Sequence, residues 1–277
     1  MNELNELFSL KGKVIVVTGA TGLLGQKHAE AIAAYGGEPI LIDLSQIAID
    51  NLSEKLNKEY GINSFGFAID ITNESLISEN AFFLKKKFGK IDGLVNNAAN
   101  NPKVENIKGE NFSRLENFPL DVWQQDIAVG LTGAFLCAKH YGSQISDNES
   151  GGVIVNIASD LGLIAPDQRL YKQDNIIDSQ QNVKPVTYSV IKTGLIGLTR
   201  YLSTYWADKN VRCNAMCPGG VENGQPEEFL KKINSRIPLG RMAHVNEYQG
   251  VLIWMLSDAS SYLNGAIIPV EGGRTAW

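Results

Sequence analysis

Three side chains of this 277-residue chain have the types and spacing needed to move a proton: Ser159, Tyr188 and Lys192. Tyr188 and Lys192 are four residues apart, so on a helix they share one face. A free phenol has a pKa of about 10, and a neighbouring ammonium stabilises the phenolate and lowers that pKa. Ser159, at the end of an expected strand, could hydrogen-bond the oxygen of a reacting carbonyl. The pattern predicts acid–base chemistry, although Tyr188 and Lys192 alone would also fit an ordinary pair on a helix surface.

A glycine-rich turn predicts a second site, for a cofactor that carries phosphate. It reads TGATGLLG from Thr18 to Gly25, between an expected strand and an expected helix. Glycines let the backbone approach a pyrophosphate, and the helix N-terminus supplies N–H donors. Asp43 follows at roughly the 20-residue spacing of an acid that hydrogen-bonds the adenosine ribose. This carboxylate would repel a 2′-phosphate, and neither the turn nor Leu44 offers a cation, so NAD is favoured over NADP. The alternative is that Asp43 only caps its strand.

These residues lie on an alternation of short apolar runs and longer amphipathic stretches. Strands are expected at 14–17, 39–42, 64–69, 91–95, 153–157, 211–216 and 267–270. Helices are expected at 25–35, from the second strand to about 58, and at 74–88, 120–143, 188–207 and 245–257. Nearly continuous apolar strands between helices indicate an α/β fold with a parallel sheet covered on both faces. No linker divides the chain, so residues 1–277 are expected to form one domain.

Two polar segments interrupt this rhythm, at about 100–119 and 166–185. Both follow strand ends where ligands bind in open α/β sheets, and long irregular loops in a compact domain are usually functional or disordered. Arg169 and Lys172 in the second segment would suit a carboxylate or phosphate of the substrate. The alternative is that they are exposed loop charges.

The composition restricts the partners of the chain. Apolar residues make up 44% and charged residues 20%, as in ordinary globular proteins. Twenty-five basic against 30 acidic residues leave a net charge of −5, which argues against a nucleic-acid surface. No apolar stretch approaches the ~20 residues of a membrane span. Without a secretory pattern, a cytoplasmic location is expected. Cys137, Cys213 and Cys217 are expected to be free thiols that bind no metal, His28 to be solvated or to cap its helix, and His140 to be a surface or subunit-contact residue.

Together the motifs resemble the short-chain dehydrogenase/reductase family in its compact, single-domain form. The matching pieces are TGATGLLG (18–25), Asp43, Asp70-Ile71, NNAA (96–99), Ser159, YSVIK (188–192) and CPGGV (217–221). The resemblance implies a Rossmann-type, doubly wound parallel sheet of about seven strands, a nicotinamide cofactor, and a Ser–Tyr–Lys centre for hydride transfer. It also implies a homo-oligomer, a tetramer or dimer, built on helices 120–143 and 188–207. The cofactor contacts that we expect are Gly19, Thr21, Gly22, Leu23, Leu24, Gly25, Asp43, Leu44, Asp70, Ile71, Asn97, Ala98, Ala99, Tyr188, Lys192, Pro218, Gly219, Val221 and Asn223.

Four features depart from the family pattern. Glycine stands at 22 rather than 23, a spacing similar to that of the extended subfamily of sugar-nucleotide epimerases and dehydratases. Gly130 stands where the family has an Asn that helps to hold a water in its proton relay. Asn223 stands where a Thr is usual. The stretch from Ser159 to Tyr188 is about twice as long as in the family.

The loop before KPVTYSVIK, the segment PGGVENGQ and the tail EGGRTAW resemble oxidoreductases of flagellin-modification and nonulosonate-sugar pathways. That resemblance implies a sugar-derived substrate. The predicted function is therefore an NAD-dependent oxidoreductase acting on an alcohol or ketone of a polar, sugar-derived substrate, with Tyr188 as acid/base. The alternatives are an epimerase or dehydratase with tightly bound NAD, and a non-catalytic NAD-binding protein.

Overall fold

The computed structural model describes residues 3–100 and 111–277, which contain a seven-stranded sheet. Its order is β3-β2-β1-β4-β5-β6-β7, and every neighbouring pair is parallel. The strands are β1 (Val14–Thr18), β2 (Glu38–Asp43), β3 (Phe65–Ala68), β4 (Gly93–Asn96), β5 (Gly152–Ile157), β6 (Val211–Pro218) and β7 (Ile267–Val270). The expected doubly wound, Rossmann-type fold is confirmed.

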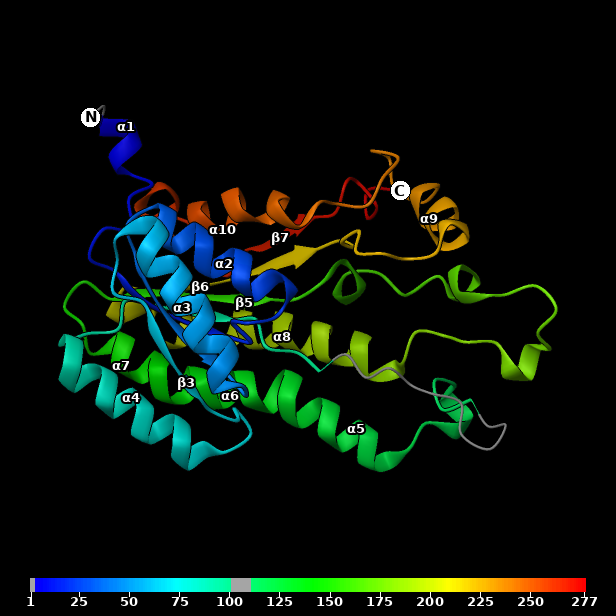
Figure 1. The fold of residues 1–277 in the computed structure, drawn as a ribbon, viewed down its shortest axis with the longest axis horizontal. Helices are drawn as coiled ribbons and strands as arrows, with labels where there is room; N and C mark the ends of the chain where they lie inside the picture. The colour runs from blue at the N-terminus through cyan, green and yellow to red at the C-terminus, as the bar shows by residue number, and fades with distance from the viewer. Residues whose placement is uncertain (1–2, 101–110) are drawn as a thin grey trace.

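Helices cover both faces of this sheet (Figure 1). They are α1 (Glu3–Glu6), α2 (Leu23–Ala34), α3 (Gln46–Tyr60), α4 (Glu74–Phe88), α5 (Leu120–Ile127), α6 (Gly133–Cys137), α7 (Ser143–Ser146), α8 (Val186–Tyr205), α9 (Glu227–Asn234) and α10 (Gln249–Leu256). One face is covered by α2, α3 and α10, and the other by α4, α8 and the α5–α7 segment. Among the described residues, none of the helices could span a bilayer.

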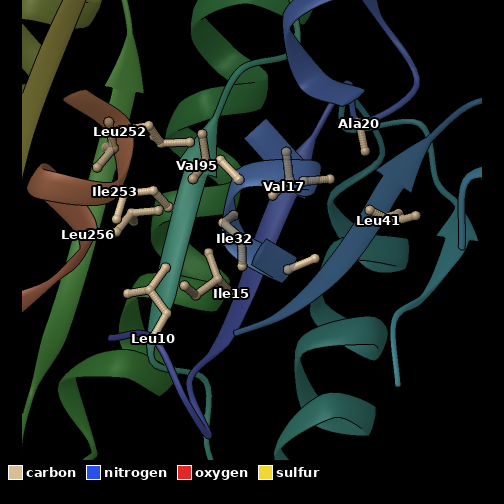
Figure 2. Close-up of a cluster of buried hydrophobic side chains, with 14 of the residues drawn as sticks. Leu10, Ile15, Val17, Ala20, Ile32, Leu41, Val95, Leu252, Ile253 and Leu256 are labelled. Carbon is tan, nitrogen blue, oxygen red and sulfur yellow. The ribbon is translucent and has the colours of Figure 1, made fainter. Parts of the chain in front are cut away.

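Two apolar cores lie between the sheet and these layers. Strand β1 is buried along its whole length and contributes Ile15 and Val17 to one core and Val14 and Val16 to the other. Figure 2 shows the first core, in which side chains of α2 and α10 pack on the central strands. Because both faces are covered, the strand carries no polar alternation.

Local caps fix where several helices start and stop. Ser45 caps α3 and Asn73 caps α4 through side-chain oxygens, and both helices end at glycines with positive φ, Gly61 and Gly89. Helix α2 differs, because its N-cap residue, Gly22, offers no side-chain cap. The chain therefore leaves the first N–H groups of α2 without a side-chain acceptor.

Several expected element boundaries need correction. The helix expected at 120–143 runs to Ser146 as α5–α7, joined by π-helical turns at 128–132 and 138–142. The helix expected at 25–35 is α2 and spans Leu23–Ala34, and α8 spans Val186–Tyr205 rather than 188–207. The last expected helix splits into a 3-10 turn at 245–248 and α10. Helix α9 is not foreseen at all, and i,i+4 Glu–Lys ion pairs along it support this short helix.

The segment 166–185 is a long loop, as expected, with two short 3-10 turns at 168–171 and 178–180. It extends beyond the carboxyl end of the sheet, near α9 and the C-terminus (Figure 1). Of the other predicted insertion, residues 101–110 lie outside the described residues, and the remainder holds a 3-10 turn at 115–117.

Candidate active site

A cleft of about 630 Å³ runs along the carboxyl ends of the strands. It is lined by all but one of the residues expected to contact a cofactor: Gly19, Thr21, Gly22, Leu23, Leu24, Asp43, Leu44, Asp70, Ile71, Asn97, Ala98, Ala99, Tyr188, Lys192, Pro218, Gly219, Val221 and Asn223. The exception is Gly25, where a Cβ would lie 2.0 Å from the Gly19 carbonyl oxygen. Gly25 therefore allows α2 to pack on the turn rather than lining the cleft.

The glycine-rich turn forms the floor beside α2. Gly19 has a φ of +61°, and a Cβ there would meet the Ala98 Cα at 2.8 Å. The Asn97 side chain donates to the carbonyl oxygens of Thr18 and Gly19, both at 3.0 Å. With α2 uncapped by any side chain, its first N–H groups suit an anion such as a pyrophosphate. The residues present therefore fit a dinucleotide.

Asp43 ends β2 and holds the same turn. Its Oδ2 accepts from the Thr21 backbone N–H at 2.8 Å and from the Thr21 hydroxyl at 2.7 Å. Its Oδ1 accepts from the Leu44 N–H at 2.8 Å. The carboxylate both organises the turn and lines the cleft, so the strand-cap interpretation and the ribose-binding interpretation are compatible.

The three predicted acid–base residues come together beside the cleft, which Tyr188 and Lys192 line. Tyr188 and Lys192 lie on the first turns of α8, and Ser159 follows β5. The Tyr188 hydroxyl donates to Ser159 Oγ at 3.3 Å. Lys192 Nζ lies 5.8 Å from the centre of the Tyr188 ring and donates to the Ile157 carbonyl oxygen at 2.8 Å.

Burial sets the proton affinities of this pair. Burial raises the pKa of the Tyr188 phenol, while its hydrogen bond with Ser159 opposes that rise. Burial also lowers the pKa of Lys192 from 10.5 to about 8. The structure does not show the expected net lowering of the phenol pKa, because desolvation and the Asp160 carboxylate raise it, and the hydrogen bond with Ser159 and the Arg274 charge only partly oppose them.

Ser159 has partners that the sequence did not suggest. Its hydroxyl donates to Asp160 Oδ1 at 2.8 Å, and Asp160 Oδ2 accepts from Arg274 Nη1 at 2.6 Å. This ion pair is largely buried, with side-chain exposures of 3% for Asp160 and 10% for Arg274. A substrate oxygen that accepts from Ser159 must replace the bond to Asp160. The pair ties the C-terminal tail to the acid–base centre.

Gly130 is packed against α8. A Cβ at Gly130 would lie 2.7 Å from Cγ2 of Ile191, the residue before Lys192. The position where the family has an Asn thus faces space that Ile191 fills. Four residues earlier, the buried carboxylate of Asp126 accepts from Asn100 at 3.0 Å and from the Thr187 hydroxyl at 2.6 Å.

A second cavity, of about 220 Å³, adjoins the cleft and shares its lining at Ala99, Asn100, Lys184, Tyr188 and Lys192. Its other walls include Ser113, Asp126, Tyr171 and Asn182. The two predicted substrate residues are not among the described residues that line it. Arg169 instead pairs with Asp167 at 2.8 Å, and Lys172 pairs with Asp178 at 3.2 Å.

Sequence reasoning missed Asp160, Lys184 and Arg274. Asp160 directly follows Ser159, and Lys184 precedes Tyr188 by four residues, so spacing along the chain could have indicated both. Arg274 reaches the site only through the tertiary fold. Its place in the tail resembling sugar-modifying enzymes was the available signal.

The histidines and cysteines lie outside this centre. The expectation that His28 is solvated or caps its helix is wrong: the ring is fully buried, and neither nitrogen has a hydrogen-bond partner among the described residues. Burial lowers the pKa of His28 to about 4. His140 is a partly exposed surface residue beside Glu74, at 3.0 Å. Cys137, Cys213 and Cys217 are buried free thiols.

This fold and this site define a nicotinamide-binding oxidoreductase of the Rossmann type. The family profile for short chain dehydrogenases matches residues 13–171, and the profile for enoyl-(acyl carrier protein) reductases matches residues 175–275. The chain belongs to the short-chain dehydrogenase/reductase family, whose members bind nicotinamide cofactors.

Individual relatives agree with this family. A D-threitol dehydrogenase from Mycolicibacterium smegmatis is 30% identical over 97% of this chain and 95% of its own. An NADP-dependent mannitol dehydrogenase from Hypocrea jecorina is 31% identical over 99% of this chain and 96% of its own. The crystal structure of an NAD+-bound xylitol dehydrogenase superposes with a TM-score of 0.83, at 25% identity, covering 95% of this chain and 99% of that one. Dehydrogenases of alcohols and polyols are therefore among its relatives.

Proposed function

We propose that this protein is an NAD-dependent oxidoreductase that transfers hydride between nicotinamide and an alcohol or ketone of a polar, sugar-derived substrate. The observation that carries the proposal is the hydrogen bond of Tyr188 with Ser159, with the ammonium of buried Lys192 5.8 Å from the centre of the Tyr188 ring, where the cofactor cleft meets the second cavity. The polyol dehydrogenases among the relatives support an alcohol substrate. The sugar-modification resemblance, homo-oligomeric assembly and cytoplasmic location stay predictions.

Each side chain has a defined task in this proposal. A bound nicotinamide supplies the hydride acceptor or donor. In the oxidative direction, the Tyr188 phenolate removes the proton of the substrate hydroxyl, and Ser159 holds the same oxygen beside the phenol. The Lys192 ammonium stabilises the phenolate electrostatically. In the reductive direction, Tyr188 returns a proton to the carbonyl oxygen. The buried setting excludes water and strengthens these interactions.

Asp43 supports NAD as the cofactor. Its carboxylate lines the cleft next to the ribose-binding position expected of the family, and Leu44 after it offers no cation for a 2′-phosphate. The relatives include both an NADP-dependent enzyme and an NAD+-bound one. The choice therefore depends on this chain's own residues.

The test is turnover followed at the NADH absorbance band, with polyols, aldonates and sugar phosphates as candidate substrates and NAD and NADP in parallel. We expect NAD-dependent turnover that Tyr188→Phe abolishes. The double variant D43S/L44R should shift the preference toward NADP by at least about tenfold. Undiminished turnover in Tyr188→Phe, or faster wild-type turnover with NADP, would contradict the proposal.

A second candidate, an epimerase or dehydratase with tightly bound NAD, is favoured by the glycines at 19, 22 and 25. Denaturing the purified protein and assaying the released nucleotide separates it from a dehydrogenase that exchanges cofactor freely. For the third candidate, a non-catalytic NAD-binding protein, any steady turnover that Lys192→Ala removes is decisive against it.

A further inference from the structure

Lys184 places a second ammonium beside the acid–base centre. Its Nζ lies 3.8 Å from the centre of the Tyr188 ring, closer than Lys192 Nζ at 5.8 Å. Lys184 lines both the cofactor cleft and the adjoining cavity. It therefore stands where a substrate in the cavity would meet the nicotinamide end of the cleft.

The backbone holds Lys184 in this position. Its N–H donates to the Gln168 side-chain oxygen at 2.8 Å, and the following residue, Pro185, is the N-cap of α8. Proline fixes its own backbone angle and restricts the residue before it. The ammonium is thus presented by an anchored segment at the start of a helix.

Lys184 has no ion pair or side-chain hydrogen bond among the described residues, although it is partly buried. Burial lowers the pKa of its ammonium, and the Asp160 carboxylate only partly opposes this. Asp160 is itself engaged by Arg274 and Ser159. Asp126, on the wall of the same cavity, accepts from Asn100 and Thr187.

The other cations of the loop, unlike Lys184, have carboxylate partners. Arg169 forms a bidentate pair with Asp167, and Lys172 pairs with Asp178. A partly desolvated ammonium that lacks a counter-ion is costly unless a ligand supplies one. Two lysines line these walls, and neither pairs with a carboxylate of the described residues. Lys192 donates to the Ile157 carbonyl oxygen, whereas Lys184 has no such acceptor in the described part of the chain.

We propose that Lys184 binds an anionic group of the substrate, a carboxylate or a phosphate, so that the enzyme acts on an acidic sugar derivative. This inference rests on the proposed function and names the substrate class of that same site. The anion would sit in the cavity beside the Tyr188 ring, while the amide N–H₂ of Asn182 on its wall, which donates to no described residue, offers a hydrogen bond to a hydroxyl. Lys184 is then a specificity residue, distinct from the acid–base pair.

The experiment compares three six-carbon ligands that differ in charge: D-sorbitol, D-gluconate and sorbitol 6-phosphate. Their dissociation constants are measured by calorimetry on the full chain saturated with NADH, for wild type, K184M, K184R and the exposed-lysine control K86M. We expect one or both anions to bind wild type at least about tenfold tighter than sorbitol. K184M should lose this advantage, whereas K184R and K86M should keep it. Gluconate and sorbitol 6-phosphate separate a carboxylate from a phosphate.

Several results would overturn the inference. These are equal or absent binding of the anions, an anion advantage that survives K184M, and a weakening of NADH itself by K184M, which would assign the cation to the cofactor. Because binding needs no turnover, anion-selective binding without catalysis would defeat the proposed function and leave Lys184 as an anion-binding residue. Efficient turnover of a neutral polyol that K184M leaves unchanged would defeat the inference and keep the function.

Discussion

At the scale of single residues, Lys192 governs how the acid–base centre responds to pH. Burial lowers the pKa of Lys192 to about 8 and raises that of the Tyr188 phenol. Alcohol oxidation needs the phenolate together with the ammonium. The form with phenolate and ammonium has lost one proton, as has the form with phenol and neutral amine, so the ratio of the two does not change with pH. We therefore expect kcat/KM for oxidation to rise about tenfold per pH unit until the pair loses its first proton at about pH 8. It should then stay level until the pair loses its second proton.

The variant K192R tests this assignment, because arginine stays charged across the range. The break near pH 8 should move upward in K192R, as measured from initial rates over pH 6 to 10.5. A break that stays in place would assign it to another group.

His28 predicts a pH-dependent stability that has nothing to do with catalysis. Its folded-state pKa of about 4 lies below the ordinary 6.5, so between these values the unfolded chain binds a proton that the folded chain does not. Stability should therefore fall as the pH falls through this window, by about 2 kcal/mol between pH 7.5 and 5. Urea unfolding of wild type and His28→Leu at both pH values measures this. The leucine variant should lose about that share of the pH dependence; an unchanged slope would exclude His28 as its source.

At the scale of elements, the contact between Gly130 and Ile191 sets how closely the α5–α7 segment approaches α8. Gly130→Ala would put a Cβ 2.7 Å from Ile191 Cγ2. We expect it to lower the free energy of unfolding by about 1–3 kcal/mol, despite the better helix propensity of alanine. The double variant G130A/I191A should show a favourable coupling, because the second change removes the clashing group.

Gly250→Ala is the matched control, since a Cβ there meets nothing within 4 Å. It should leave stability unchanged or slightly raised in the same urea titrations. If G130A left the free energy of unfolding as little changed as G250A, the α5–α7 segment could move away from α8 at no cost. Close packing would then not explain why Gly130 replaces the family's Asn.

The elements also show what the sequence could and could not predict. Buried strands such as β1 were predictable, since a short run of β-branched apolar residues beginning with Val14 and followed by a glycine-rich turn is typical of a strand in a parallel sheet. The cleft followed from them, because parallel strands bring Asp43, Asn97 and Pro218 to one edge. Helix α9 is short and polar, and ion pairs support it. The π-helical turns in α5–α7 leave no mark in an apolar periodicity.

The acid–base centre was predictable only where its residues are close together in the chain. Tyr188 and Lys192 share one helix, so their spacing was sufficient. The contact of Asp160 with Arg274 joins residues 114 positions apart, and no local pattern encodes it. The burial of His28 depends on the helices that pack against α2, which a helix-surface interpretation cannot include.

At the scale of the whole molecule, exposed aromatic side chains on α6 and α8 bear on the predicted assembly. Phe135 is 49% exposed, and Tyr201 and Tyr205, 60% and 58% exposed, stack on each other at 5.4 Å along α8. These helices are the ones on which the family resemblance places subunit contacts. Aromatic residues are enriched at the centres of protein interfaces. We therefore expect a homo-oligomer in which this surface is covered.

Light scattering coupled to size-exclusion chromatography tests the assembly directly. The wild-type chain should have a mass close to four times, or twice, that of one chain. The double variant F135E/Y201E should dissociate, because the free-energy cost of burying two unpaired carboxylates exceeds the free energy of association of an ordinary subunit interface. Phe82→Glu is the control, since Phe82 on α4 is 70% exposed but lies on a different helix. A monomeric wild type, or equal dissociation of the Phe82 variant, would show that the α6 and α8 aromatics do not hold the subunits together.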